Sequence, residues 1–359
     1  MFLQTLLQAA ALLPILYSTA SAQTACNNSP SLCNKPYNNI THLGAHDSPF
    51  LRNEQTSFST SGNQYYNSTV QLDAGVRLLT AQVHKANETS AGSQWHLCHT
   101  SCSLLDMGTL ESWLSSIKSW MDKNPNDVVT ILLVNSDNAA ASDLGSQFKS
   151  SGIDKYAYVP PSTTTIPQNW PTLQSLISNG TRLMTFVASI TPSTTYPYLM
   201  DEFTFMFEND FNNEKPTDFS CVPARPTTLN NSTDQALSSG RMFLMNHFLY
   251  DAQLFGIQTP NENAAGSTNG QTGVGSLGTS LSTCTSVYNG RVPTFTIVDF
   301  FNRGPAMASV DKANGVTNPV GRISVPEEAL KPKTGGGKKN SGSLLAVVLA
   351  VVAAVAFGC

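Results

Sequence analysis

The chain has 359 residues, of which 40% are hydrophobic and 12% are charged, and its formal net charge is −4. This charge balance lacks the basic surface by which proteins bind nucleic acid, so nucleic acid is excluded as a partner. The length between the two apolar ends suits one α/β barrel, which typically needs ~250 residues.

Residues 1–22 have the features of a secretory signal peptide. Leu6–Leu16 is apolar, and Ala20-Ser21-Ala22 supplies the small residues that signal peptidase requires, although no Lys or Arg precedes the apolar run. An N-terminal membrane anchor is the alternative, but the apolar stretch is too short for a membrane span.

The other end has the pattern of a glycosylphosphatidylinositol (GPI) attachment signal. Residues 344–359 form an apolar tail with no basic residue after it, and residues 331–343 precede it as a polar stalk. Gly335–Gly337 offers small residues for attachment, with Asn340-Ser341-Gly342 as an alternative site. We therefore expect the tail to be removed and the protein to be anchored in the outer leaflet, at the extracellular face of the plasma membrane or in the cell wall. A plain transmembrane tail anchor remains the alternative.

The cysteines agree with secretion. Cys359 would leave with the tail, and an even set of six remains for an oxidising compartment. Proximity favours the pairs Cys26–Cys33 and Cys98–Cys102, and elimination leaves Cys221–Cys284, although six cysteines can pair in many ways. Zinc binding is the rival interpretation, but the spacings match no zinc-finger pattern. Glycosylation sequons, several of which we expect to carry glycan and mark the surface, begin at Asn27, Asn39, Asn67, Asn87, Asn179, Asn230 and Asn231.

Residues 23–330 read as a single domain in which strands alternate with helices. An apolar run from Ile40 ends at Gly44, and Gly108–Lys123 has the 3.6-residue period of an amphipathic helix, with Asp106 as its expected N-cap. Further strands are expected at Val76–Val83, Val128–Val134, Arg182–Ala188, Glu202–Glu208, Arg241–Leu249 and Pro293–Phe300, helices at Ser142–Lys149 and Thr172–Ser178, and long loops at Pro192–Pro197 and Thr259–Ser280. This alternation predicts parallel crossover units, as in a (β/α) barrel.

Polar residues recur where these strands end, and in a (β/α) barrel the carboxyl ends of the strands form the rim on which active sites lie. Solvation of loops would explain any one of them, but explains the whole set less well. The candidates are His46 and Asp47, Gln82 and His84, Asn135, Glu208, Asn246 and Asp299.

Two histidines and a carboxylate are sufficient for general acid–base chemistry on a phosphate ester, because one group must remove a proton and another must return one. His46-Asp47 follows the first strand, and His99 lies in a short segment between Cys98 and Cys102. A buried histidine bonded to its neighbour is the simpler interpretation of the His46-Asp47 pair alone.

Four segments carry a resemblance to a known family: residues 43–48 (LGAHDS), 75–79 (GVRLL), 124–130 (NPNDVVT) and 298–301 (VDFF). Together with His99 they resemble the phosphatidylinositol-specific phospholipase C X-domain superfamily, most closely its bacterial and secreted fungal branches. The resemblance is good from about residue 39 to 136 and thinner afterwards. It implies a distorted TIM barrel that cleaves a phosphodiester in one or two steps.

By position, the resemblance implies that His46 is the general base for the inositol 2-hydroxyl and that Asp299 orients it. It implies that His99 is the general acid for the leaving glycerol oxygen, with Asp47 as its partner. Each imidazole needs such a carboxylate to fix its tautomer.

The chain departs from the family on the second strand. Bacterial members have an arginine there that binds the phosphoryl oxygens, and the calcium-dependent branch has acidic metal ligands. Here the positions are Thr80 and Gln82, which supply neither a positive charge nor a good calcium site. We therefore expect a site without metal or cofactor, in which His84 or His96 could supply charge. The expected substrate-binding residues are Gln82, His84, Asn135, Glu208 and Asn246.

Two functions follow. The first is an extracellular phosphodiesterase acting on a phosphoinositide or related phosphodiester. The second is a catalytically silent barrel that acts as a binding or structural protein of the cell surface or wall. A magnesium-dependent phosphodiesterase would need acidic ligands after the second strand, and these are absent.

Overall fold

The structure is a computed structural model that describes residues 24–86, 94–253 and 257–332. The expected signal peptide, nearly all of the stalk, the apolar tail and the sequon at Asn87 lie outside the described residues.

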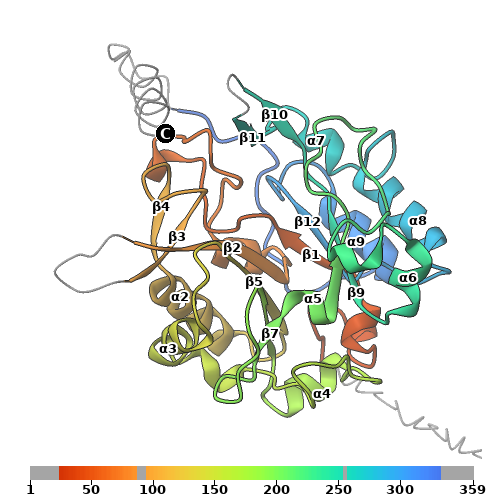
Figure 1. Ribbon diagram of the computed structural model, residues 1–359. Helices are drawn as coiled ribbons and strands as arrows, with labels where there is room; N and C mark the ends of the chain where they lie inside the picture. Colours follow the sequence, from red (N-terminus) through yellow and green to blue (C-terminus); the bar gives the residue numbers. More distant parts are fainter. Residues whose placement is uncertain (1–23, 87–93, 254–256, 333–359) are drawn as a thin grey trace, which may run out of the picture.

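The centre of the fold is a sheet of eight parallel strands in the order β7-β6-β5-β2-β1-β12-β9-β8. The sheet curls into a distorted TIM barrel (Figure 1). Its two end strands, β7 and β8, are not paired with each other in the described strand order. The α/β barrel prediction is therefore confirmed. The parallel strands are β1 (His42–Ala45), β2 (Leu78–Lys85), β5 (Val129–Asn135), β6 (Leu183–Ala188), β7 (Leu199–Asp201), β8 (Met206–Glu208), β9 (Met242–Asn246) and β12 (Phe295–Val298).

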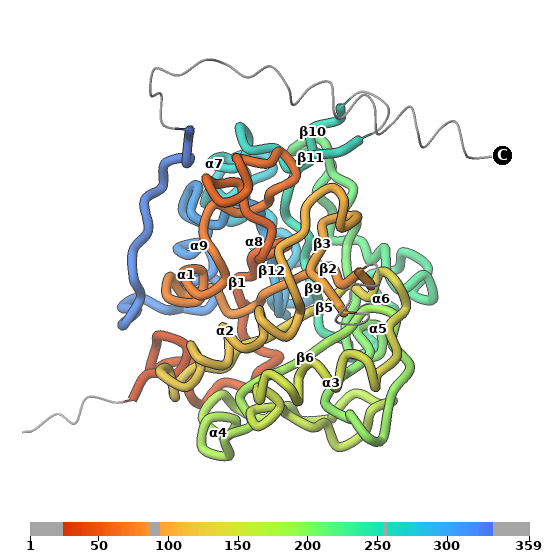
Figure 2. The backbone as a smooth tube through the Cα atoms, turned by 90° about the vertical axis from the view of Figure 1, so that its left-hand side faces the viewer, coloured from red at the N-terminus to blue at the C-terminus, as the bar shows by residue number. Residues whose placement is uncertain are grey.

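Helices cover the outside of the barrel, so the strands are buried on both faces, as their unbroken apolar runs indicate. All six residues of β6 are buried. Figures 1 and 2 show α2 and α3 side by side against one part of the sheet, with α8 and α9 against another. The helices are α1 (Ser68–Asp73), α2 (Leu110–Lys123), α3 (Ala141–Ser151), α4 (Leu173–Ser178), α5 (Glu202–Phe205), α6 (Thr233–Ser238), α7 (Ala265–Thr268), α8 (Leu277–Val287) and α9 (Ala306–Asn314).

Three sequence predictions are wrong in detail. The N-cap of α2 is Thr109, whose hydroxyl accepts from the backbone N–H of Ser112, while Asp106 belongs to a strand and contacts His96. The stretch Glu202–Glu208 is a turn of helix followed by a three-residue strand, because Asp201 caps the N-terminus of α5 through Thr204 N–H. The expected loop Thr259–Ser280 contains α7 and the first turn of α8.

Antiparallel strands that the sequence did not suggest extend the sheet at β2. β3 (Trp95–Cys98) pairs with the end of β2, and β4 (Asp106–Thr109) pairs with β3 across an irregular register. These strands are four residues long, too short to produce a clear alternation. They matter because they carry His99 to the barrel rim. A separate hairpin of β10 (Tyr250–Ala252) and β11 (Gln258–Pro260) follows β9.

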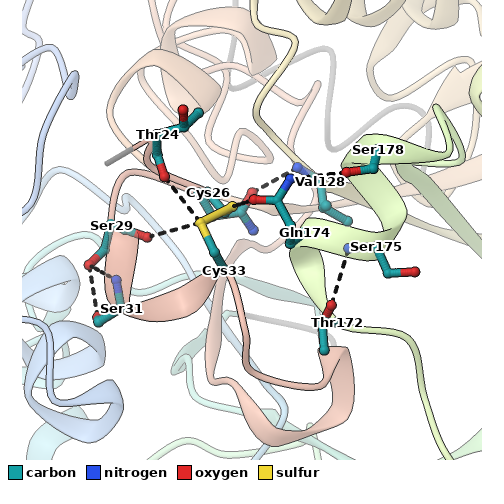
Figure 3. The surroundings of a disulfide bond; sticks show 11 residues. Thr24, Cys26, Ser29, Ser31, Cys33, Val128, Thr172, Gln174, Ser175 and Ser178 are labelled. Atoms are coloured by element: carbon teal, nitrogen blue, oxygen red, sulfur yellow. Dashed lines mark hydrogen bonds between the residues drawn. A yellow bond between two sulfur atoms is a disulfide. The ribbon is translucent and has the colours of Figure 1, made fainter. Parts of the chain in front are cut away.

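The three predicted disulfides are confirmed: Cys26–Cys33, Cys98–Cys102 and Cys221–Cys284. Figure 3 shows the first of them beside α4, where Gln174 Oε1 lies 3.6 Å from Cys26 Sγ. Backbone hydrogen bonds from Leu173 and Gln174 to Lys35 and Cys33 attach the N-terminal segment to the start of this helix.

The sequons do not all mark the surface. Asn27 is 4% exposed and its side chain accepts a hydrogen bond from Val128 N–H, so its amide is not presented to solvent. The other five described sequon asparagines are exposed: Asn39, Asn67, Asn179, Asn230 and Asn231. Within the described ranges, none of the helices combines the length and apolar character that a membrane crossing needs.

Candidate active site

The end of β1 presents His46 at the barrel rim. The backbone N–H of His46 still bonds Val298 of β12, at 2.9 Å, and Asp47 then turns the chain with a φ of 48°. Gly44 allows β1 to lie close to its neighbours, because a Cβ there would stand 2.5 Å from Ile297 and 2.9 Å from Leu78. The histidine is therefore placed by the tight packing of β1 between β2 and β12.

Asp299, which follows β12, fixes the His46 ring. Its Oδ1 lies 2.9 Å from His46 Nδ1, and Asn63 donates to the same oxygen at 3.0 Å. The ring also stacks on Phe248 with a centroid distance of 3.8 Å and an interplanar angle of 6°. With the Nδ1 proton held by Asp299, Nε2 is the nitrogen left to exchange a proton.

His99 follows β3 and is held by its own short loop. The disulfide Cys98–Cys102 closes this loop, and His99 N–H donates to Leu105 O at 2.9 Å. The edge of the ring meets Phe50 at a centroid distance of 5.2 Å. The loop therefore positions the second imidazole.

The two imidazoles converge on one carboxylate. Asp47 Oδ2 lies 3.6 Å from His46 Nε2 and 3.6 Å from His99 Nε2, so the two Nε2 atoms are at most twice that distance apart. Asp47 is 2% exposed and is itself held by two residues of β2: Thr80 Oγ1 accepts from Asp47 N–H, and Gln82 Nε2 donates to Oδ2, both at 2.8 Å. Asp47 therefore holds both imidazoles beside one carboxylate.

The two imidazoles have opposite pKa shifts. Burial would lower the pKa of His46, but the carboxylates of Asp47 and Asp299 outweigh burial and raise this pKa above its usual 6.5. Burial lowers the pKa of His99, and the carboxylates of Asp47 and, to a smaller extent, Asp299 offset this only in part. In the free protein, His46 therefore binds a proton more readily than His99.

A cavity of about 170 Å³ opens beside His46 and Asp47. Gln82, Glu208 and Asn246 line it, as expected for residues at strand ends. His99 is not part of the lining and reaches the site through its contact with Asp47. The remaining lining residues are Thr80, Leu132, Val134, Ala188, Glu202, Phe211, Arg225, Phe248, Tyr250 and Ile297.

Two expected binding residues lie elsewhere. His84 is on the antiparallel end of β2, with Nδ1 3.3 Å from Asp137, and does not line the cavity. Asn135 caps the turn after β5, where its side chain exchanges hydrogen bonds with the backbone of Ala139. His96, considered as a source of charge, pairs with Asp106 outside the cavity.

Sequence analysis missed Glu202, Arg225 and Asn63. Arg225 lies 17 residues after the Glu208 that it contacts, in a stretch with no strand pattern, and it reaches the rim through an isolated bridge between the two backbones. Glu202 is buried, and burial together with the neighbouring Glu208 carboxylate raises its pKa well above the usual range. Both causes disfavour the charged form of this carboxyl.

One group of three potential metal ligands is present among the described residues: Cys98, Cys102 and Asp106. Both sulfur atoms are joined in a disulfide, so they are not available to a metal ion.

Sequence comparison places this geometry in a family. Residues 32–314 match the family described as PI-PLC X 1. A PI-PLC X domain-containing protein of Arthroderma benhamiae is 35% identical over 292 residues, which cover 81% of this chain and 90% of the relative. An uncharacterized secreted protein of the same fungus is 36% identical over 301 residues, 81% of this chain, but this match spans only 64% of the relative's length.

The fold agrees with this assignment. The phosphatidylinositol-specific phospholipase C of Listeria monocytogenes has a TM-score of 0.50 at 17% identity, over 79% of this chain and 95% of that chain. A structure of the corresponding enzyme of Staphylococcus aureus has a TM-score of 0.52 at 12% identity, over 80% and 97%. The chain belongs to the PI-PLC X-domain family.

Proposed function

We propose that the protein is an extracellular phosphodiesterase that cleaves a phosphatidylinositol-type lipid, or a related phosphodiester, by metal-independent acid–base catalysis between His46 and His99. The observation that carries this proposal is the convergence of both Nε2 atoms on Asp47 Oδ2, at 3.6 Å each. A buried histidine that serves only as packing would not need a second imidazole on the same carboxylate.

In the proposed reaction His46 Nε2 accepts the proton of a substrate hydroxyl, whose oxygen forms a new bond to phosphorus. The bond from phosphorus to the lipid oxygen breaks, and His99, paired with Asp47, gives that oxygen its proton. Asp299 holds the imidazolium that forms on His46, as the 2.9 Å contact to Nδ1 allows. A water molecule could open the resulting cyclic phosphate by the reverse proton transfers.

The pKa order bears directly on these roles. A base must begin neutral and an acid must begin protonated, whereas in the free protein His46 has the higher pKa and His99 the lower. The reactive form is therefore a minor protonation state of the free site. Negative charge on a bound phosphodiester raises the pKa of both rings and favours the proton that His99 must carry.

The second candidate is a silent barrel that binds at the cell surface. The β2 positions favour it, because Thr80 and Gln82 bring no charge to the phosphoryl group and the Gln82 amide is bonded to protein groups at both ends. An activity screen separates the two candidates. The secreted protein is incubated with phosphatidylinositol, its glycosylated forms and other phosphodiesters, with a chelator present.

The expected result is that the wild type releases a cyclic phosphodiester, or the phosphomonoester formed when water opens it, and that His46→Ala does not. Equal activity in His46→Ala would refute the assignment of the base. No cleavage of any diester in the panel would favour the silent barrel.

The proposed location is the outer face of the membrane or the cell wall. Three disulfides are typical of secreted proteins, and one relative is named a secreted protein. The C-terminal pattern supports a GPI anchor, and the five exposed sequons support glycosylation. The anchor is tested by detergent partition. The native protein should enter the detergent phase and should no longer do so after enzymatic cleavage of the GPI. A mass decrease after glycosidase treatment tests the glycans.

A further inference from the structure

The lining of the cavity carries an unusual set of charges. Asp47 and Glu208 line the cavity as carboxylates, and the two residues that β2 contributes to the lining, Thr80 and Gln82, are uncharged. A phosphodiester is itself an anion, and negative charge persists on its oxygens through the transition state. Without a cation these carboxylates would repel the substrate.

Arg225 is the one arginine or lysine among the described residues that line the cavity. The backbones of Arg225 and Glu208 are joined by hydrogen bonds in both directions, at 2.9 and 3.2 Å, so the arginine is fixed at the end of β8. Its guanidinium lies over the ring of Phe211, 4.8 Å from the centroid, which limits its motion toward solvent. The positive charge of Arg225 is therefore held in a fixed position beside the cavity.

The hydrogen-bonding capacity of this guanidinium is largely unused. A guanidinium has five N–H donors. One nitrogen, Nη2, contacts Glu208 Oε2, while Nε is buried with no partner within the described residues. Planar donors with this spacing match the oxygens of a phosphoryl group.

The groups around Arg225 orient its guanidinium. Asn246 Nδ2 donates to Glu208 Oε2 at 3.0 Å, so Glu208 is held by two partners and acts as a positioning residue for Arg225. Glu202, 1% exposed, is the other acidic group on this wall. Burial and the neighbouring Glu208 raise the pKa of Glu202, so its carboxyl competes less than Glu208 does for the guanidinium.

We propose that Arg225 binds the non-bridging oxygens of the substrate phosphoryl group and supplies, from the end of β8, the positive charge that β2 does not. This inference rests on the proposed function and names the residue that makes it electrostatically possible. It also separates two roles in the site. The His46–Asp47–His99 group transfers protons, and Arg225 stabilises the negative charge of the phosphoryl group.

The test compares wild type, Arg225→Gln, Arg225→Lys and the double variant Glu208→Gln/Arg225→Gln. The double variant removes both charges together, so no buried carboxylate is left unpaired and folding is protected. Arg322→Gln is the matched control, because Arg322 also has an ion pair with a carboxylate, Asp311, and does not line the cavity.

Two measurements are made on each protein. The first is kcat/KM on phosphatidylinositol and on its Rp and Sp phosphorothioates, in which sulfur replaces one non-bridging oxygen. The second is the shift in melting temperature caused by inorganic phosphate. We expect Arg225→Gln and the double variant to lose about 10²-fold or more in kcat/KM, together with the wild-type preference between Rp and Sp. Arg225→Lys should retain part of both, and the phosphate shift should persist in Arg322→Gln and vanish in Arg225→Gln.

An Arg225→Gln enzyme with the wild-type Rp to Sp ratio, or with the wild-type phosphate shift, would overturn the inference even if its activity fell. A wild type that phosphate does not stabilise would overturn it as well. If the wild type binds phosphate through Arg225 but cleaves no diester in the panel, the proposed enzyme fails and the binding role of Arg225 stands.

Discussion

Gln82 donates a hydrogen bond from Nε2 to Asp47 Oδ2 at 2.8 Å. The other end of the same amide, Oε1, accepts from Thr100 N–H at 2.9 Å. Gln82 therefore joins the carboxylate between the two imidazoles to the loop that carries His99. At a position where the family resemblance implies a charged residue, this chain has a neutral crosslink within the site.

The first prediction concerns this crosslink. Gln82→Leu removes both hydrogen bonds and leaves Asp47 Oδ2 without its donor. A hydrogen bond to a charged group contributes about 1.5–3 kcal/mol, so we expect kcat to fall roughly 10- to 100-fold with a smaller change in KM. Gln82→Glu should lower activity further, because it places a second carboxylate against Asp47.

The readout specific to positioning is the titration of His99, followed by NMR. Because Asp47 raises the pKa of His99, a displaced Asp47 should lower that pKa further in Gln82→Leu. The exposed residue Gln168 provides the control variant Gln168→Leu. An unchanged His99 titration in Gln82→Leu would contradict the positioning role.

The second prediction concerns the proton on His46. An NMR titration of the wild type should give His46 a pKa above 6.5 and His99 a pKa below it. In Asp299→Asn the imidazolium of His46 loses one of the carboxylates that stabilise it, so its pKa should fall while that of His99 changes less. Activity should follow a bell-shaped pH profile whose limbs belong to the coupled pair. Equal pKa values for the two rings in the wild type would show that the site is arranged differently.

The third prediction concerns the disulfide Cys98–Cys102. In the double variant Cys98→Ser/Cys102→Ser the loop carrying His99 is no longer closed, so kcat should drop about 10-fold or more, the scale on which misplaced catalytic groups act. The variant Cys26→Ser/Cys33→Ser is the control, since that disulfide lies beside α4 and lines no part of the cavity. It should lose stability but keep kcat. A similar loss of kcat in both variants would mean that the His99 loop does not depend on its own disulfide.

Residues at strand ends could be expected to lie near one another because a parallel barrel brings the carboxyl ends of its strands to one rim, whatever the loops do. His46 and Asp299 meet for this reason, although 253 residues separate them. The same rule led us to expect His84 at the rim. It does not lie there, because the end of β2 continues into an antiparallel extension. Asn135 was expected to bind substrate, but its side chain accepts a hydrogen bond from the backbone of its own turn instead.

Arg225 and Asn63 could not be found in the same way. Neither follows a strand, and each reaches the site through a tertiary contact: Arg225 through its pairing with Glu208, and Asn63 through its hydrogen bond to Asp299. The hydrophobic period of a sequence reports burial and local geometry, so it carries no information on such contacts.

The last prediction concerns stability in acid. Burial lowers the pKa of His42 to about 4, and its ring lies between Tyr37 and Phe295 at the start of β1. Burial also lowers the pKa of His247 to about 4. At pH 7 both rings are neutral in the folded chain and mostly neutral in the unfolded chain. As the pH falls from 6.5 to 4 the unfolded chain takes up protons that the folded chain does not, so the free energy of unfolding decreases.

At 1.36 kcal/mol per pKa unit, each buried histidine should remove about 3 kcal/mol of stability by pH 4. The raised pKa of His46 acts in the opposite direction, since it favours the folded state once the pH is below 6.5, and this contribution is lost as the pH rises through the folded pKa. Urea unfolding at pH 7 and pH 4.5 measures the balance. His42→Phe, which keeps a ring of similar shape between Tyr37 and Phe295, should show a smaller loss between the two pH values than the wild type. An equal loss in both proteins would mean that His42 binds a proton in the folded state, and that its ring is less buried than the packing against Phe295 implies.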